Sequence, residues 1–399
     1  MAVKSRKVFY FPGYDPKPAR RYREIYRTEA RKQAEISGYN IDVKGRKADG
    51  GPYRWEIDAQ FGRQKVKTDY EFMMWTDIVK DSMEGSILKS YWVFLITGWR
   101  YYFSGAWGAY KRLGRPPFIV TLYPFLVLGG QLLIALFAWI LTGVLLGLFL
   151  PQWIGWTLGA GAFVAVLKYY KSIDHRLYAH YLMYDYGYAV SEGGEYPKSL
   201  IKRINYFTDR ITAASNEGYD EILLVGHSSG ANVAISALAD ALRSMNLNRD
   251  VSINLLTIGH VIPLISYLPK AHEMRADLNF LSGHTGISWI DFTAPTDSVC
   301  FAFVDPVSTS GVDALDRKWP IMLSAQFKAA MDPKRFEALR KKYFQIHIQY
   351  LCAFEKPQNY EYFAITAGPK TLAERFKGFK HTPQRISEVH SPFTNIAPR

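Results

Sequence analysis

Residues 222–234 read ILLVGHSSGANVA, and this stretch decides the fold class. The wholly apolar run 222–225 is typical of a buried strand in a parallel sheet, and the alanine-rich run 229–244 predicts a helix. Between them, Gly226, Ser228 and Gly230 form a G-x-S-x-G pattern. A serine held on a sharp strand-to-helix turn needs small residues two positions before and after it, because the backbone there is strained and closely packed.

This spacing selects Ser228 as the candidate nucleophile. For Ser229 the flanking positions would be His227 and Ala231, which are larger than glycine. The helix that begins here directs N–H groups and its positive dipole end toward a developing oxyanion. Neighbouring side chains on such a turn point to different sides, so we interpret His227 as a pocket or packing residue. The competing interpretation is a glycine-rich turn that carries an idle serine.

The rest of the chain alternates strand and helix patterns, which favours an α/β fold. Apolar residues at three- and four-residue steps predict a helix over 200–214. Residues 44–90 fit either short strands or an irregular excursion. Further strands are expected at 7–11, 39–43, 252–259, 287–293 and 319–324, with another helix at 18–36.

With these elements in place, the chain resembles the α/β-hydrolase superfamily, and within it the lipases and esterases. The resemblance covers residues 7–45 and 197–370. It implies a mostly parallel sheet flanked by helices, with an insertion between the two parts. It also implies an oxyanion hole built from the N–H of Ser229 and an N–H of the loop after the first strand, at Tyr14 with Gly13 next. That loop reads Pro-Gly where the superfamily has His-Gly, so an ordinary turn is the alternative there.

The superfamily places an acid after the serine and a histidine after the acid. Asp297 follows the strand expected at 287–293, where a carboxylate can orient an imidazole. Asp291 lies inside that strand pattern and Asp305 comes later, so either can be a structural residue.

His347 is the favoured base, because it follows Asp297 and lies among aromatic residues, with His390 as the alternative. His381 and His390 lie in a tail rich in Pro, Ser and Thr. The competing interpretation of any single histidine is a packing residue. Chain order sets aside the histidines that precede the acid, namely His260, His272 and His284.

No charged residue occurs between Arg115 and Lys168. These 52 residues would be roughly 78 Å long as one helix, so two membrane spans fit better, at 124–148 and 153–169 with a turn at 150–152. The alternative is a buried hairpin in a soluble protein. The aromatic stretch 91–114 predicts either an interfacial segment or a core helix.

Basic residues flank the apolar region on both sides, and none occurs at its turn. We therefore expect both termini and the soluble part to be cytoplasmic. No cleavable signal is visible at the start of the chain. The flanking residues are Lys111, Arg112 and Arg115 before the region, and Lys168, Lys171 and Arg176 after it.

The formal net charge of +13 arises largely from residues 1–115, which hold 23 Lys and Arg against 13 Asp and Glu. Because the apolar region follows, we expect this charge to face anionic lipid rather than nucleic acid. Cys300 and Cys352 lack metal-ligand spacing and fit a reducing compartment, and no glycine loop for a phosphate cofactor is present, so no metal or cofactor is expected.

The expected organisation has four parts, at 1–90, 91–170, 171–380 and a loosely ordered tail at 381–399. The expected function is a membrane-integrated serine hydrolase that cleaves lipid or other long-chain acyl esters through Ser228, His347 and Asp297. An acyltransferase with the same triad and a non-enzymatic membrane scaffold are the alternatives. The oligomeric state and the acyl length are left open.

Overall fold

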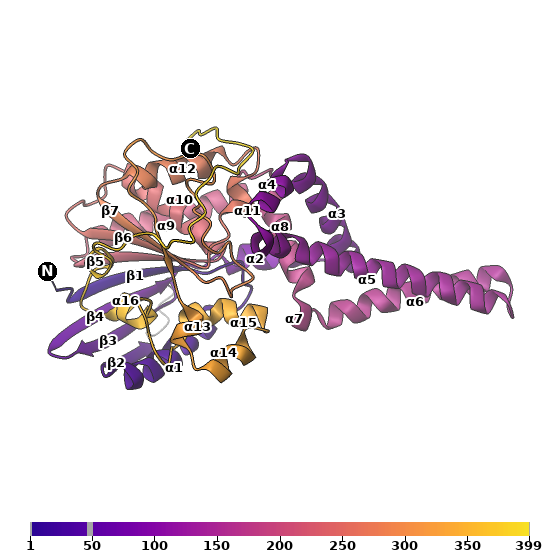
Figure 1. Ribbon diagram of the computed structural model, residues 1–399, viewed down its shortest axis with the longest axis horizontal. Helices are drawn as coiled ribbons and strands as arrows, with labels where there is room; N and C mark the ends of the chain where they lie inside the picture. The colour runs from indigo at the N-terminus through magenta and orange to yellow at the C-terminus, as the bar shows by residue number, and fades with distance from the viewer. Residues whose placement is uncertain (1, 46–50, 399) are drawn as a thin grey trace.

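The computed structural model describes residues 2–45 and 51–398, so part of the segment 44–90, expected to form short strands or an irregular excursion, lies outside the described residues at 46–50. A single eight-stranded sheet forms the centre, in the order β2-β3-β4-β1-β5-β6-β7-β8 (Figure 1). Neighbouring strands from β4 to β8 pair in parallel, whereas β3 is antiparallel to both of its neighbours. The strands are β1 Ser5–Phe11, β2 Asn40–Gly45, β3 Arg54–Phe61, β4 Gln64–Phe72, β5 Glu221–His227, β6 Ser252–Ile258, β7 Ile287–Thr293 and β8 Ile321–Ser324.

Helices cover both faces of this sheet, which confirms the expected α/β class with a mostly parallel sheet. One face packs against α2 Thr76–Met83, α9 Lys198–Ser215, α10 Gly230–Arg243, α11 Pro263–Ser266 and α12 His272–Gly283. The other packs against α1 Ala19–Ser37, α13 Phe327–Ala330, α14 Pro333–Leu339, α15 Tyr343–Ile348, the 3₁₀ turn Gln349–Leu351, α16 Tyr362–Ala367 and α17 Leu372–Arg375.

The local reasons for these elements are visible in the sequence. Every residue of β5 is buried, as its continuous apolar run requires between two helical layers. Helix α1 buries the stripe Tyr22, Tyr26 and Ala30 and ends where Gly38 takes a φ of 72°. The segment expected to hold short strands or an irregular excursion forms the β3–β4 hairpin and α2.

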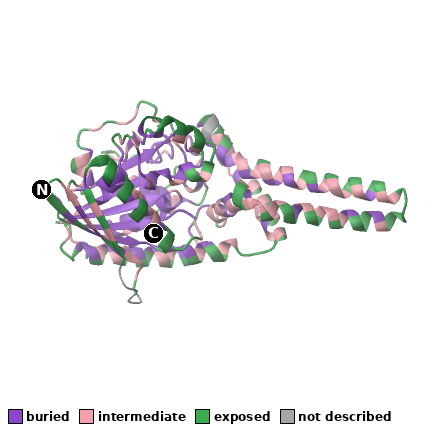
Figure 2. Cartoon of the chain, turned by 90° about the horizontal axis from the view of Figure 1, so that it is seen from below, coloured by how far each residue is buried: buried purple, intermediate pink, exposed green. Residues whose placement is uncertain are grey.

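Two long helices, α5 Arg115–Gly147 and α6 Gln152–Ser172, pack side by side and project from the body (Figure 1). Buried residues concentrate in the body, whereas the projecting pair is mostly half-buried or exposed (Figure 2). Helix α5 begins earlier than the expected span 124–148. Prolines in its first turn are tolerated because the N–H groups there have no helical partner.

Among the described residues, one helix is long and apolar enough to cross a bilayer, Pro117–Gly147 within α5, with a mean hydropathy of 2.2. The second expected span, 153–169, does not meet the same criterion, so the clear two-span pattern inferred from the sequence needs correction. The reason is composition, because α6 carries Lys168 and Lys171 together with tyrosines and glycines, which lower its mean hydropathy.

The stretch 91–114 forms parts of two helices, α3 Ile87–Phe103 and α4 Ala106–Arg112, beside the base of the hairpin (Figure 1). Helix α3 buries Ser90, Thr97 and Tyr101 against the protein. Its opposite face leaves large apolar side chains exposed, namely Leu88, Trp92, Leu95, Trp99 and Phe103. Two further helices, α7 Asp174–Leu177 and α8 Ala179–Val190, lead the chain from α6 back to the sheet.

The C-terminal segment is held against the body, which corrects the expected loosely ordered tail at 381–399. The backbone N–H of His390 donates to the carbonyl of Thr309 at 2.9 Å, and Asn395 accepts from the buried Arg275. Over its described residues, 381–398, the segment has no helix or strand. Composition alone therefore suggested disorder, but polar backbone groups of the segment form hydrogen bonds with the domain.

Candidate active site

The turn that carries Ser228 joins the end of β5 to the start of α10. Ser228 adopts a φ of 57°, in the left-handed region that non-glycine residues rarely enter. Its N–H donates to the carbonyl of Ile258 at 3.1 Å, which ties the turn to the end of β6. Strain of this kind persists only where the surrounding structure imposes it, and it is typical of functional sites.

The flanking glycines are required by close backbone contacts. A Cβ at Gly226 would lie 2.6 Å from Cα of Ala231, and one at Gly230 would overlap the carbonyl oxygens of Phe11 and Pro12. A Cβ at Gly13 would lie 2.9 Å from Cβ of Ser228. The loop after β1 is therefore packed directly against the turn.

His347 and Asp297 form a hydrogen-bonded pair beside this turn. Nδ1 of His347 lies 2.7 Å from Oδ2 of Asp297, and both residues are buried. The other ring nitrogen of His347, Nε2, is buried without a hydrogen-bond partner in the described structure. A histidine oriented in this way by a carboxylate presents its second nitrogen as a proton acceptor.

The carboxyl group of Asp297 has a definite charge state. Burial alone would raise the pKa of Asp297, but the adjacent His347 ring, its hydrogen bond and the N–H of Val299 hold that pKa below its usual value. Asp297 therefore carries its negative charge near neutral pH. In that state it stabilises the protonated form of His347 that a proton transfer would create.

Ser228 and His347 line one cavity of about 580 Å³, together with Gly13, Tyr14 and Asp185. Gly13 and Tyr14 follow the carboxyl end of β1, and Ser228 follows that of the neighbouring parallel strand β5. Ligands of open α/β sheets bind at this edge.

Two backbone N–H groups near Ser228 correspond to the oxyanion donors expected from the sequence. Within the described part of the chain, the N–H groups of Tyr14 and Ser229 donate no hydrogen bond. Ser229 is the first residue after Ser228 and immediately precedes α10, and Tyr14 lines the cavity from the loop that contacts Ser228. The carbonyl of Tyr14 accepts a hydrogen bond from the hydroxyl of Tyr181, which holds this loop in place.

His227 is a packing residue in this arrangement. Its Nδ1 lies 3.0 Å from the hydroxyl of Tyr10, its Nε2 lies 3.2 Å from the carbonyl oxygen of His347, and its ring stacks on that of His347 at 4.8 Å. Burial, together with the neighbouring His347, lowers the pKa of His227 to about 3. A neutral, fully hydrogen-bonded ring supports His347 and does not compete with it as a base.

The alternative acids and base lie elsewhere. Asp291 accepts a hydrogen bond from Thr257 at 2.6 Å within the sheet. Asp305 accepts from Arg385 and from the N–H groups of Val307 and Ser308, as a structural residue does. His390 does not line the cavity.

Two residues of the site were not identified from the sequence. Gly259, with a φ of 54°, lies where a Cβ would be 3.1 Å from Cε1 of His347 and 3.3 Å from Oδ2 of Asp297. Its only signal is a glycine directly after an apolar strand. Asp185 of α8 lines the cavity and accepts a hydrogen bond from the hydroxyl of Ser229 at 3.3 Å. Nothing in its local sequence marks Asp185.

Among the described residues, no group of three His, Cys, Asp or Glu side chains is placed to hold a metal ion. Comparisons with protein-family models, with curated proteins and with solved structures found no match for this chain. The function is therefore inferred from the geometry of the site.

Proposed function

We propose that this chain is a membrane-anchored serine hydrolase of the α/β-hydrolase type, which cleaves carboxylic esters of lipids or other long-chain acyl groups. The observation that carries the proposal is the cavity shared by Ser228 and His347. Its serine lies on a strained turn, and its histidine is bonded to Asp297 through Nδ1 while Nε2 has no partner within the described chain.

The chemistry proceeds through an acyl-enzyme. His347 accepts the proton of Ser228 as Oγ attacks the ester carbonyl carbon, and the resulting oxyanion is bound by the N–H groups of Ser229 and Tyr14. The tetrahedral intermediate expels the alcohol, which takes its proton from His347. Water, deprotonated by the same histidine, then attacks the acyl-enzyme, and Ser228 regains its proton as the carboxylic acid leaves.

Three features of the hairpin and its surroundings support membrane anchoring. Only 22% of the most apolar window of α5 is buried, unlike the core helix of a soluble protein. The free face of α3 presents tryptophans, which favour the membrane interface. The connection between α5 and α6 exposes Leu148 and Phe149 and carries no charge.

The packing of α5 on α6 supports a second span despite the weaker apolarity of α6. A Cβ at Gly155 would lie 2.7 Å from the carbonyl oxygen of Gly143, and one at Gly159 would lie 2.5 Å from that of Trp139. Small residues four positions apart permit such close approach and are typical of helix pairs in membranes. With basic residues at the base of both helices, we propose two spans and a cytoplasmic catalytic domain.

The test is covalent labelling of the full chain in detergent with a fluorophosphonate, which reacts with activated serines. Wild type should be labelled at Ser228, and Ser228→Ala should lose both the label and ester hydrolysis. Ser229→Ala should retain the label, because the proposed donor at that position is a backbone N–H. A wild-type chain that takes up no label would contradict the proposal and favour a non-enzymatic scaffold.

Product analysis separates hydrolysis from acyl transfer. With an acyl ester and an added alcohol, a hydrolase should release mainly free acid, because water attacks the acyl-enzyme. Predominant formation of a new ester would instead identify an acyltransferase that uses the same three residues.

A further inference from the structure

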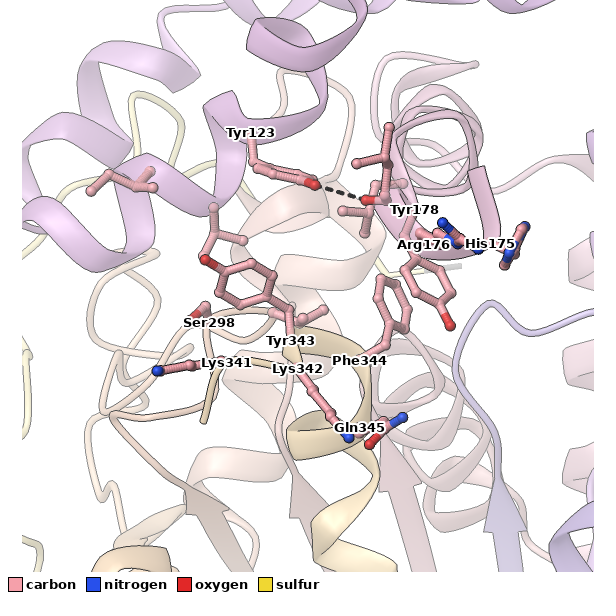
Figure 3. Close-up of a pocket in the computed structure, with 15 residues that line it drawn as sticks. Tyr123, His175, Arg176, Tyr178, Ser298, Lys341, Lys342, Tyr343, Phe344 and Gln345 are labelled. Atoms are coloured by element: carbon pink, nitrogen blue, oxygen red, sulfur yellow. Dashed lines mark hydrogen bonds between the residues drawn. The ribbon is translucent and has the colours of Figure 1, made fainter. Parts of the chain in front are cut away.

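A second cavity, of about 520 Å³, lies where α5 leaves the body of the protein. Ile119, Val120 and Tyr123 of α5 line it, as does the start of α15. Figure 3 shows Tyr123 above Tyr343 and Phe344. The hydroxyl of Tyr123 donates to the carbonyl of Leu177 at 2.8 Å, which fixes α5 against α7. We call this cavity the hairpin groove. Because it lies at the end of the apolar helix, it is placed at the membrane surface in the proposed orientation.

The hairpin groove adjoins the cavity that contains Ser228. Six residues line both, namely His175, Tyr178, Leu182, Val299, Phe344 and Gln345. The rings of Tyr178 and Phe344 stack at 4.0 Å and form part of this shared wall. The backbone of Tyr178 lies in the left-handed region, with a φ of 56°. This is a strained conformation, and it occurs where α7 meets α8.

The charge of the hairpin groove has one sign. Its lining contains Arg176, Lys341 and Lys342 as well as His175, and it contains no carboxylate (Figure 3). Across residues 2–45 and 51–398, none of these three cationic side chains forms an ion pair. The acidic residue nearest to Arg176 in the sequence is Asp174. Its carboxylate already accepts hydrogen bonds from the N–H groups of His180 and Tyr181.

We propose that the hairpin groove binds the phosphate of an anionic phospholipid whose acyl ester is cleaved at Ser228, an inference that rests on the function proposed above. Arg176, Lys341 and Lys342 supply the positive charge, and the apolar wall formed by Ile119, Val120 and the shared aromatic rings accommodates hydrocarbon. The lipid enters from the bilayer at the base of α5, and its ester reaches Ser228 past Tyr178 and Phe344. A cation held at the edge of an apolar slot selects for phosphate without the desolvation that a buried cation requires.

The first measurement is the rate of hydrolysis of phosphatidylglycerol relative to phosphatidylcholine with the same acyl chains, in mixed micelles. Wild type should prefer phosphatidylglycerol. Lys341→Ala with Lys342→Ala should reduce this preference about 30-fold, because each of the two lysines near an anionic surface contributes roughly 1 kcal/mol. For each protein, the rate on each lipid is divided by its own rate on a soluble short-chain ester, so that a general loss of activity is not counted as a loss of preference.

The matched control is Lys111→Ala with Lys168→Ala. This control also removes two positive charges near the base of the hairpin. Neither Lys111 nor Lys168 lines the groove, and both are exposed. If the control variant loses the preference as strongly as the groove variant, the lysines act only by attracting the protein to an anionic surface, and the groove proposal is overturned. Equal wild-type rates on the two lipids would overturn it as well.

A binding measurement separates this inference from the proposed function. Ser228→Ala protein is purified with added phosphatidylglycerol, and the retained lipid is measured by native mass spectrometry. Retention that disappears in the lysine double variant supports the groove even if no ester is hydrolysed, in which event only the proposed function fails. If the protein hydrolyses esters but shows neither selective retention nor headgroup preference, the proposed function is supported and the proposed lipid binding in the groove is overturned.

Discussion

The hydroxyl of Ser229 donates a hydrogen bond to the carboxyl group of Asp185 at 3.3 Å, and this contact joins α8 to the turn that carries Ser228. Helix α8 follows the hairpin in the chain and packs against α3 and α5. The contact therefore connects the hairpin region to the residue whose N–H we propose as an oxyanion donor. It also places an acidic group at the wall of the catalytic cavity.

The first prediction concerns the pH dependence of catalysis in Asp185→Asn. Burial raises the pKa of Asp185 to about 7, although the hydrogen bond from Ser229 and the nearby His347 act to lower it. Above this pH the carboxylate would place negative charge beside the developing oxyanion, so kcat of the wild type should fall as pH rises through about 7. Asp185→Asn should lack this fall, as measured by a kcat profile on a soluble ester. A fall of the same size in the variant would contradict the role of Asp185.

The same shift predicts the pH dependence of stability. The folded chain retains a proton on Asp185 between its usual pKa of 3.8 and about 7, which the unfolded chain releases. Stability contributed by the neutral carboxyl group is therefore lost as pH rises through this window. The thermal midpoint of Asp185→Asn relative to wild type should increase from pH 4 to pH 7 and then level off. A difference that stays constant across this window would be inconsistent with the raised pKa.

The second prediction concerns Gly259, which packs against the His347–Asp297 pair. In Gly259→Ala, the new Cβ would lie 2.8 Å from the ring of Tyr350 and 3.1 Å from His347, so the Tyr350 ring must shift and the imidazole is crowded. We expect kcat on a soluble ester to fall by about 100-fold, since small misplacements of a catalytic group have effects of that size. Fluorophosphonate labelling should slow in parallel.

The control for Gly259→Ala is Gly62→Ala in the β3–β4 turn. Gly62 has a similar φ of 59°, but a Cβ there would meet no atom within 4 Å. Both variants bear the same backbone strain, and only Gly259→Ala disturbs the site. Equal losses of kcat in the two variants would mean that general destabilisation, rather than displacement of His347, explains the effect.

Local sequence patterns predicted those elements that are specified by neighbouring residues alone. The glycines around Ser228 and the apolar run of β5 define a strand, a turn and a helix without reference to the rest of the chain. Asp185 could not be found in this way, because its role arises only when α8 folds back against the turn. The small helices α13 to α17 also lack a strong period of their own and depend on packing against the sheet.

The prediction of two clear membrane spans in the hairpin needed correction for a physical reason. A stretch without charge predicted two spans, at 124–148 and 153–169, but apolarity per residue differs between α5 and α6. The glycines that lower the hydropathy of α6 are the ones that allow close approach to α5. These glycines act through the contact between the two helices, so the mean hydropathy of a single helix does not detect their effect.

The third prediction concerns the buried ion pair of Arg6 and Glu221. Nε of Arg6 donates to Oε2 of Glu221 at 2.6 Å, and both side chains have no exposed surface. Glu221→Gln would leave the guanidinium buried without a countercharge, which should destabilise the fold by about 3–5 kcal/mol. The measurement is the thermal midpoint in detergent. Asp58→Asn, which breaks the exposed pair with Lys44, should leave the midpoint nearly unchanged.

The fourth prediction concerns the contact between the two hairpin helices. Leucine at Gly159 must displace α6, because even a Cβ there would lie 2.5 Å from the carbonyl oxygen of Trp139. Disulfide cross-linking between cysteines introduced at Gly143 and Trp156, which pack against each other across the two helices, should therefore be strongly reduced in Gly159→Leu. Gly161→Leu is the matched control on the same helix, since a Cβ at Gly161 meets nothing within 4 Å and the added hydrophobicity is the same. Because α8 follows α6 and contacts Ser229 through Asp185, Gly159→Leu should also slow hydrolysis of bilayer lipid more than hydrolysis of a soluble ester. Equal cross-linking in the two leucine variants would refute close glycine packing, and with it the argument that α6 crosses the bilayer beside α5.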